Sequence, residues 1–64
     1  MVKINGEPVK ADGMTVEEYL KTTDYDPVRI AIEINGDIIP KAMYSQTVIH
    51  DGDSVEIVSF VGGG

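Results

Sequence analysis

The chain has 64 residues, no cysteine and a formal net charge of −6 at pH 7. This length allows one small domain, which buries only about 60% of its extended surface, and the lack of cysteine excludes disulfides, thiolate metal sites and a cysteine nucleophile. Five scattered Lys and Arg against 11 Asp and Glu argue against a nucleic-acid or anionic-membrane partner. No segment has the apolar length of a signal peptide or a membrane span, so we expect a cytoplasmic protein.

Two Asn-Gly pairs, Asn5-Gly6 and Asn35-Gly36, predict two β-hairpins. Each pair lies between strand-like runs, and Asn-Gly accepts the positive φ angles that a two-residue type I′ turn requires. The expected pairings are Val2–Ile4 with Pro8–Lys10, and Val28–Ile34 with Ile38–Ile39.

The longer strand of the second hairpin alternates apolar and other residues, with Val28, Ile30, Ile32 and Ile34 as its apolar set. An alternation of period two indicates a strand with one buried face and one wet face. A slip of one residue would bury Arg29 and Glu33, so the register of this strand is firmly set.

A short helix is predicted between the hairpins. Thr15 followed three residues later by Glu18 is typical of a capping box at a helix start. Pro27 closes the region, because the residue before a proline avoids helical geometry. The apolar residues of the helix fall on one face, at Val16, Tyr19 and Leu20. We expect Tyr19 in the core or at its rim.

The last strand carries apolar residues on both faces, at Val55, Ile57, Val58, Phe60 and Val61. This pattern is typical of a strand buried on both sides, which predicts a central position in the sheet. Hairpin, helix, hairpin and a central last strand describe a β-grasp. The expected fold class is therefore α+β, a mixed sheet of about five strands packed on one main helix. We expect residues 1–61 to form this domain and residues 62–64 a flexible Gly-Gly-Gly tail.

No group of side chains predicts an active site. The segment Asp51–Ser54 lacks the spacing of an EF-hand loop, and turns select Asp and Gly in any case. His50 is the only histidine and has no second ligand nearby to share a metal. Glu17 and Glu18 are adjacent on the predicted helix and point in different directions, which disfavours a carboxylate pair.

The three closing glycines differ from these segments because they present a carboxylate on a narrow backbone. From Val61 the extended reach is roughly 13 Å, enough to enter another protein's active site. The alternative is an end without function, since terminal disorder is common.

Four segments of the chain resemble the ThiS family, the small sulfur carriers of thiamin biosynthesis. They are Val2–Glu7, Met14–Val16, Ile32–Pro40 and Asp51–Gly64. The resemblance covers essentially the whole chain and implies a ubiquitin-like β-grasp fold, in agreement with the fold expected from the residues.

The resemblance also implies a mechanism centred on Gly64. Its carboxylate would attack the α-phosphate of ATP inside an E1-like, ThiF-type adenylating enzyme. A persulfide sulfur from a donor protein would then displace AMP, and the resulting thiocarboxylate would supply sulfur to a ThiG-type thiazole synthase. Gly62 and Gly63 would thread into the partner. The carrier would be a co-substrate with no catalytic residue, no metal and no bound cofactor, because the ATP belongs to the partner.

Apolar residues near the tail are candidates for partner docking. Val58 and Phe60 share one face of the last strand and lead into the tail, although core packing of Phe60 stays an alternative. The full candidate set is Val58, Phe60, Val61, Ile38, Met43 and Tyr44.

Three other functions stay open. A molybdopterin-synthase small subunit would use the same tail chemistry for a different acceptor. A ubiquitin-like modifier would be conjugated to protein lysines through Gly64. An acidic β-grasp interaction module would have inert glycines, and deletion of Gly63 and Gly64 would leave its binding unchanged.

Overall fold

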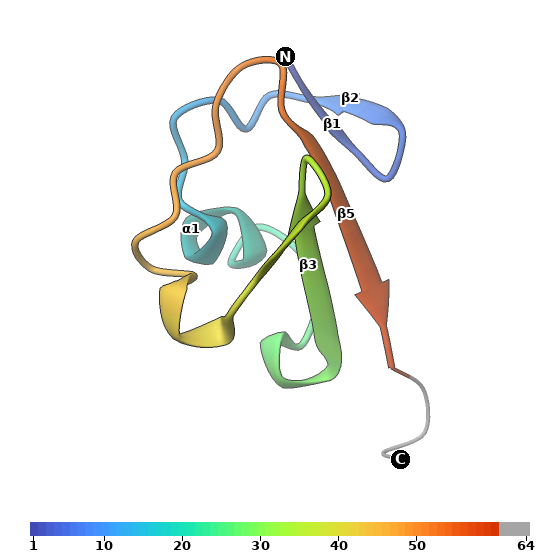
Figure 1. Cartoon of the computed structure of the whole chain (residues 1–64), viewed down its shortest axis with the longest axis vertical. Coiled ribbons are helices and arrows are strands. Elements are labelled where there is room, and N and C mark those ends of the chain that lie inside the picture. The colour runs from blue at the N-terminus through green and yellow to red at the C-terminus, as the bar shows by residue number, and fades with distance from the viewer. Residues whose placement is uncertain (61–64) are drawn as a thin grey trace.

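The computed structural model describes residues 1–60 and builds them into a five-stranded sheet with one short helix (Figure 1). Val61 and Gly62 to Gly64 lie outside the described residues, and so does the expected boundary between the domain and the tail. The elements are β1 (Val2–Ile4), β2 (Glu7–Val9), α1 (Val16–Leu20), the 3₁₀ turn η1 (Pro27–Arg29), β3 (Ile30–Ile34), β4 (Asp37–Ile39), the 3₁₀ turn η2 (Lys41–Met43) and β5 (Ser54–Ser59).

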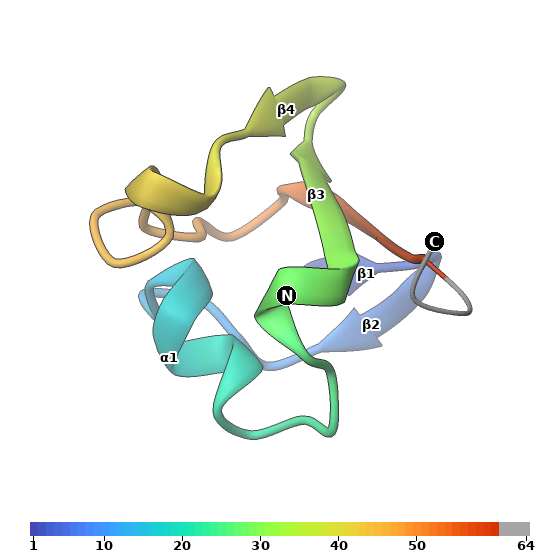
Figure 2. The same cartoon turned by 90° about the horizontal axis from the view of Figure 1, so that it is seen from below.

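The sheet has the strand order β2-β1-β5-β3-β4, so the last strand lies in the centre. β5 runs parallel to β1 and antiparallel to β3, and the two outer pairs are antiparallel. Figure 2 shows α1 on one side of this curved sheet. The expected mixed sheet on one helix, with a central last strand, is therefore confirmed.

Each outer strand pair is joined by an Asn-Gly dipeptide. Asn5 and Asn35 both have a φ of 52°, and the glycines that follow them have φ angles of 83° and 89°. Ile4 is in register with Glu7, which leaves two residues in the first loop. Positive φ at both loop positions is the backbone of a type I′ turn, whose twist matches that of the flanking strands.

The same two asparagines also hold β5 between the outer pairs. The Asn5 side-chain oxygen accepts a hydrogen bond from the Ile57 N–H at 2.8 Å, and the Asn35 side-chain oxygen accepts one from the Ser54 N–H at 2.9 Å. These amides therefore connect each turn to the central strand, a role that the turn signal alone does not reveal.

One apolar core fills the space between the sheet and α1. Its buried residues are Val2, Ile4, Ala11, Val16, Leu20, Ile30, Ile32, Ile34, Tyr44, Ile49, Val55 and Ile57. Tyr19 packs partly buried against this core, as expected. The helix begins at the predicted capping box, in which the Glu18 N–H donates to Thr15 Oγ1 at 3.1 Å and the Thr15 N–H donates to Glu18 Oε1 at 2.8 Å.

Two expectations about burial are wrong. Val28 is 76% exposed, because Pro27 and the Asp26 carboxylate, which accepts from the Val28 N–H at 3.0 Å, form a 3₁₀ turn and delay the strand until Ile30. The last strand is buried on one face only, and Val58 on its other face is 53% exposed. α1 covers one side of the sheet, so the second apolar face of β5 is open surface.

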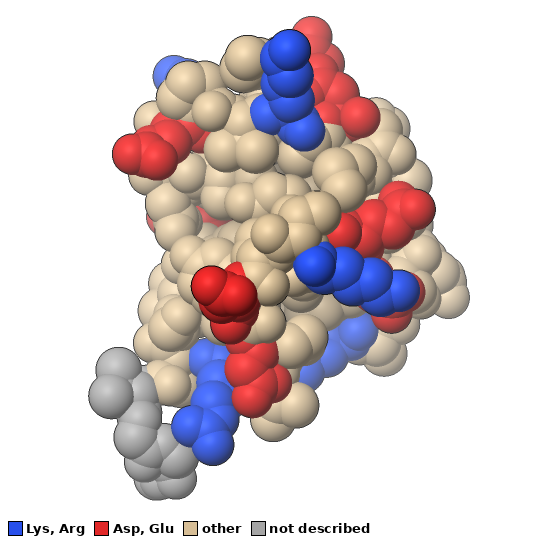
Figure 3. All heavy atoms as spheres, turned by 180° about the vertical axis from the view of Figure 1, so that it is seen from behind, with Lys and Arg blue, Asp and Glu red and all other residues tan. Residues whose placement is uncertain are grey.

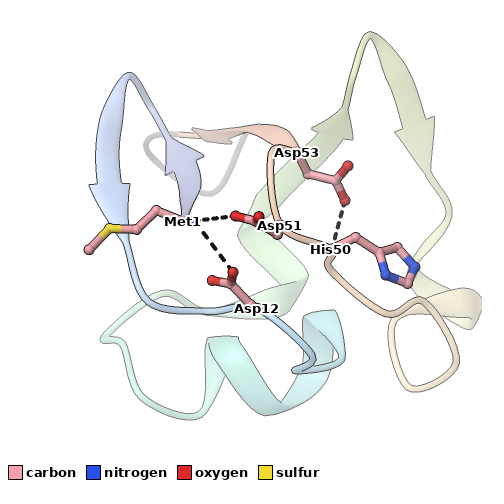
Figure 4. Close-up of polar contacts among 5 residues, drawn as sticks. All are labelled: Met1, Asp12, His50, Asp51 and Asp53. Carbon is pink, nitrogen blue, oxygen red and sulfur yellow. Dashed lines mark hydrogen bonds and ion pairs between the residues drawn. The ribbon is translucent and has the colours of Figure 1, made fainter.

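Aspartates hold the loop that precedes β5 (Figure 4). Asp53 accepts the His50 backbone N–H and the Asn35 side-chain amide, each at 2.9 Å, and these bonds lower the pKa of Asp53. The Met1 amino group forms ion pairs with Asp51 and, at 3.4 Å, with Asp12. Its hydrogen bond to Asp51 lowers the pKa of that carboxyl group.

We expect Asp53→Asn to lower the free energy of unfolding by about 1 kcal/mol at neutral pH, because the two hydrogen bonds reach different carboxylate oxygens and an amide has only one oxygen to accept them. Because the pKa of Asp53 is lowered in the folded protein, its carboxylate stabilises the fold at pH values above the ordinary pKa of an aspartate. This stabilisation is lost as the pH falls through the folded pKa. Urea unfolding should therefore show a difference from the wild type that shrinks in acid. Asp24→Asn, at an exposed position, is the control, and a difference that stays constant with pH would contradict this account.

Candidate functional site

The face of the sheet opposite α1 carries an apolar patch beside the end of β5. Val58 and Phe60 alternate along the chain and therefore share this face, where they are 53% and 54% exposed. Ala31 lies directly opposite Val58 in the neighbouring strand. Ile38, 73% exposed, pairs with Glu33 and so projects from the same side. We call Ala31, Ile38, Val58 and Phe60 the open-face patch.

Phe60 links this patch to the end of the chain. Its N–H donates to the Arg29 carbonyl at 2.7 Å, so the pairing of β5 with β3 extends to this residue. Its exposure excludes core packing, the alternative that the sequence left open. In the sequence, Val61 and the three glycines follow Phe60.

One of the predicted docking residues belongs to the core. Tyr44 is 5% exposed, and its burial raises the pKa of its hydroxyl, so its assignment to a docking surface is wrong. The chain turns inward after η2, and the Tyr44 carbonyl accepts the Glu17 N–H at the start of α1 at 3.0 Å. Met43 is 41% exposed but lies in η2, outside the sheet.

The remaining predicted site residues are Val61, Gly62, Gly63 and Gly64, which lie outside the described residues. The last described residue before them is Phe60, which directly follows β5.

Two glutamates face each other on the same open face, beside the open-face patch. Glu33 of β3 is in register with Glu56 of β5, and like charges directly opposite each other destabilise a sheet. Within residues 1–60 the ion pairs are Met1 with Asp12, Met1 with Asp51, and Arg29 with Asp26, so neither glutamate has a cation partner there. Sequence reasoning missed this pair because the register between β3 and β5 was not part of the prediction.

The rest of the described surface offers little for other chemistry. On the face seen in Figure 3, basic side chains lie singly or in small groups among acidic and uncharged ones. Within residues 1–60, no group of three or more His, Cys, Asp or Glu side chains is placed to hold a metal ion. The same part of the chain contains no helix with the length and apolar character needed to cross a bilayer.

Comparisons with known proteins agree with this geometry. The family model that matches residues 2–64 is that of the ThiS family. The sulfur carrier protein ThiS of Bacillus subtilis (strain 168) is 36% identical over 66 residues, with 100% of both chains covered. The crystal structure of the thiamine biosynthesis protein ThiS from Geobacter metallireducens matches with a TM-score of 0.81 and 30% identity, over 98% of this chain and 97% of that chain.

A thiazole synthase of Paramagnetospirillum magneticum is also similar, with 45% identity over 62 residues. The match covers 95% of this chain but 19% of that protein, so this chain spans about a fifth of that relative's length. The family match, in contrast, extends over nearly the whole sequence. The chain belongs to the ThiS family.

Proposed function

We propose that this chain is a sulfur carrier of thiamin biosynthesis and acts as a protein co-substrate, with no catalytic residue of its own. The observation that carries the proposal is the family match over residues 2–64, together with full-length similarity to a ThiS sulfur carrier. The β-grasp fold supports it, because the central strand ends beside an exposed apolar patch, two residues before the glycines in the sequence. The same match favours thiazole formation over the pterin pathway or protein modification.

The proposed chemistry takes place at the carboxylate of Gly64. A carboxylate oxygen attacks the α-phosphorus of ATP, the bond to the β-phosphate breaks, and pyrophosphate leaves. The terminal sulfur of a protein persulfide then attacks the carbonyl carbon of the acyl-adenylate, and AMP leaves with the electron pair of the broken C–O bond. A thiol reduces the resulting acyl disulfide and becomes oxidised, which leaves a thiocarboxylate on Gly64.

The proposed partners are an E1-like adenylating enzyme, a persulfide donor and a thiazole synthase. The thiazole synthase that contains a segment similar to this chain supports the last of them. ATP, and any metal that accompanies it, belong to the adenylating enzyme. We also propose a cytoplasmic location, because a chain without cysteine suits a reducing compartment.

In this proposal the open-face patch is the docking surface for these enzymes. Gly62 and Gly63 carry no side chain, so they fit a narrow channel next to that surface. Glu33 and Glu56 add a preference for a partner that presents a Lys or Arg. A cation between the two carboxylates would offset the repulsion that they exert on each other in the free carrier.

We expect Glu33→Gln combined with Glu56→Gln to weaken binding to the adenylating enzyme about tenfold and to flatten its salt dependence. The same double variant should be as stable as the wild type or more stable by about 0.5 kcal/mol, because a like-charge pair has been removed. Isothermal titration at two salt concentrations measures the first effect, and urea unfolding measures the second.

Glu7→Gln combined with Asp24→Asn is the matched control, since it removes the same charge from exposed positions away from this pair. Equal weakening by both double variants would show that only net charge matters. A loss of stability in the Glu33 and Glu56 variant would contradict the repulsion on which the argument rests.

ATP–pyrophosphate exchange tests the proposed function. A purified E1-like enzyme of the ThiF type should exchange labelled pyrophosphate into ATP only when this chain is present. An enzyme that exchanges with another ThiS carrier but not with this chain would contradict the proposal.

A further inference from the structure

A groove of about 480 Å³ lies on the helix side of the molecule, between the end of α1, the loop that follows it, η1 and η2. Its apolar walls come from Leu20, Tyr25, Pro27 and Tyr44. In Figure 2, α1 lies near the two short turns, which are green at 27–29 and yellow at 41–43, and these elements surround the groove. The volume is within the range of about 300–1,000 Å³ that is typical of small-molecule sites. We call it the α1 groove.

The charges that line the α1 groove differ in sign from those of the whole chain. Lys21, Lys41 and Glu17 line it, which gives a local charge of +1 in a chain with a net charge of −6. Lys41 is partly fixed there, because its Nζ donates to the Ile30 carbonyl at 2.9 Å and keeps its other N–H groups free to donate. The groove is therefore suited to a ligand with one negative charge.

Tyr44 supplies a hydrogen-bonding group that the free protein does not use. The residue is 5% exposed, and within residues 1–60 its buried hydroxyl has no hydrogen-bond partner. Burial raises the pKa of this hydroxyl, so it keeps its proton and remains a donor at neutral pH. Buried polar groups without a partner are rare in native proteins, and a ligand can supply the missing acceptor. Neighbouring side chains must shift slightly for this contact, because the hydroxyl is closed to water.

From these features we propose that the α1 groove binds a small aromatic monoanion, such as an aromatic carboxylate. The ring packs against Leu20, Tyr25 and Pro27, the acid group lies near Lys21 and Lys41, and an oxygen of the ligand accepts from Tyr44. The site lies on the helix side, whereas the open-face patch lies on the opposite side of the sheet, so both can be occupied at once. The proposal does not depend on the function as a sulfur carrier.

The probe for this proposal is 8-anilinonaphthalene-1-sulfonate, an aromatic monoanion, added to the full chain labelled with ¹⁵N. We expect saturable shifts of the backbone amide signals at Leu20, Thr23, Tyr25 and Lys41, with one site per chain. N-phenyl-1-naphthylamine, which lacks the sulfonate, should bind at least about fivefold more weakly. Shifts confined to Val58 and Phe60 would place the probe on the open-face patch and overturn the proposal.

Two variants test the contacts of the proposed ligand. Lys21→Gln combined with Lys41→Gln should weaken binding of the probe by about fivefold or more, whereas Lys3→Gln combined with Lys10→Gln, with the same change in charge, should not. Tyr44→Phe should weaken binding about threefold to tenfold yet leave the urea midpoint unchanged or higher, because the hydroxyl has no partner in the free protein. Equal affinities for the two lysine pairs, or unchanged binding by Tyr44→Phe, would overturn the assignment.

Discussion

Deletion of Gly64 is expected to lower the rate of thiocarboxylate formation by at least about 100-fold. The deletion moves the terminal carboxylate back along the chain by about 3.3 Å, while the proposed docking through the open-face patch would hold the body of the carrier in the same place. A misplacement of 1 Å at a reacting centre can already cost about 100-fold in rate. The rate follows from the appearance of thiocarboxylate in a reaction with ATP, the adenylating enzyme and a persulfide source.

This loss should come without unfolding, because the core is built from residues 2–57. Urea unfolding of the deletion variant should match that of the wild type. One extra glycine after Gly64 shifts the carboxylate in the other direction and should also be inactive. Normal rates for both the shortened and the extended chain would contradict the proposal that the terminal carboxylate must reach one fixed position in the partner's active site.

The second large effect is expected at the open-face patch. Val58→Ser combined with Phe60→Ser should weaken binding to the adenylating enzyme about 100-fold, since two apolar side chains lose roughly 3 kcal/mol of burial between them in the complex. The stability of the free carrier should change little, because both side chains are more than half exposed. Isothermal titration gives the affinity, and urea unfolding gives the stability.

The matched control uses apolar residues that are exposed outside the sheet. Val28→Ser combined with Val48→Ser removes apolar surface at positions that are 76% and 39% exposed. This control should bind with nearly the wild-type affinity. Similar losses for both pairs would mean that general hydrophobicity, and not the open-face patch, determines binding.

Much of the fold could be predicted because several signals in the sequence are local. Thr15 and Glu18 form the capping box from which α1 starts, and the apolar alternation from Ile30 to Ile34 matches the buried face of β3. The central place of β5 is confirmed, but the burial of both faces from which it was predicted is wrong, because one face of the strand is exposed.

The errors arise where the tertiary arrangement decides burial. Val28 is apolar and so continues the alternation of the strand, but Asp26 and Pro27 start a 3₁₀ turn that leaves its side chain exposed to water. Val58 looked like a core residue because nothing in the sequence shows that one face of the sheet has no second layer. Tyrosine is a residue type common at docking surfaces, yet the path of the chain after η2 buries Tyr44 beneath α1.

For the functional site, the sequence indicated Val58 and Phe60, which are exposed on the open-face patch. The role of Gly64 stays a prediction, because that residue lies outside the described ones. The sequence could not indicate the pairing of Glu33 with Glu56, because that contact depends on the register between strands 23 positions apart in the chain. The α1 groove was missed for a similar reason, as Lys21, Tyr25 and Lys41 come together only through the loops after α1 and β4.

The most direct test of the carrier function is the intact mass of the chain after incubation with ATP, its adenylating enzyme, a persulfide donor and a thiol. We expect a mass gain equal to the replacement of one oxygen by sulfur, localised by fragmentation to the peptide that ends at Gly64. An unchanged mass, in a reaction where the same enzymes convert another ThiS carrier to its thiocarboxylate, would contradict the proposal that this chain carries sulfur.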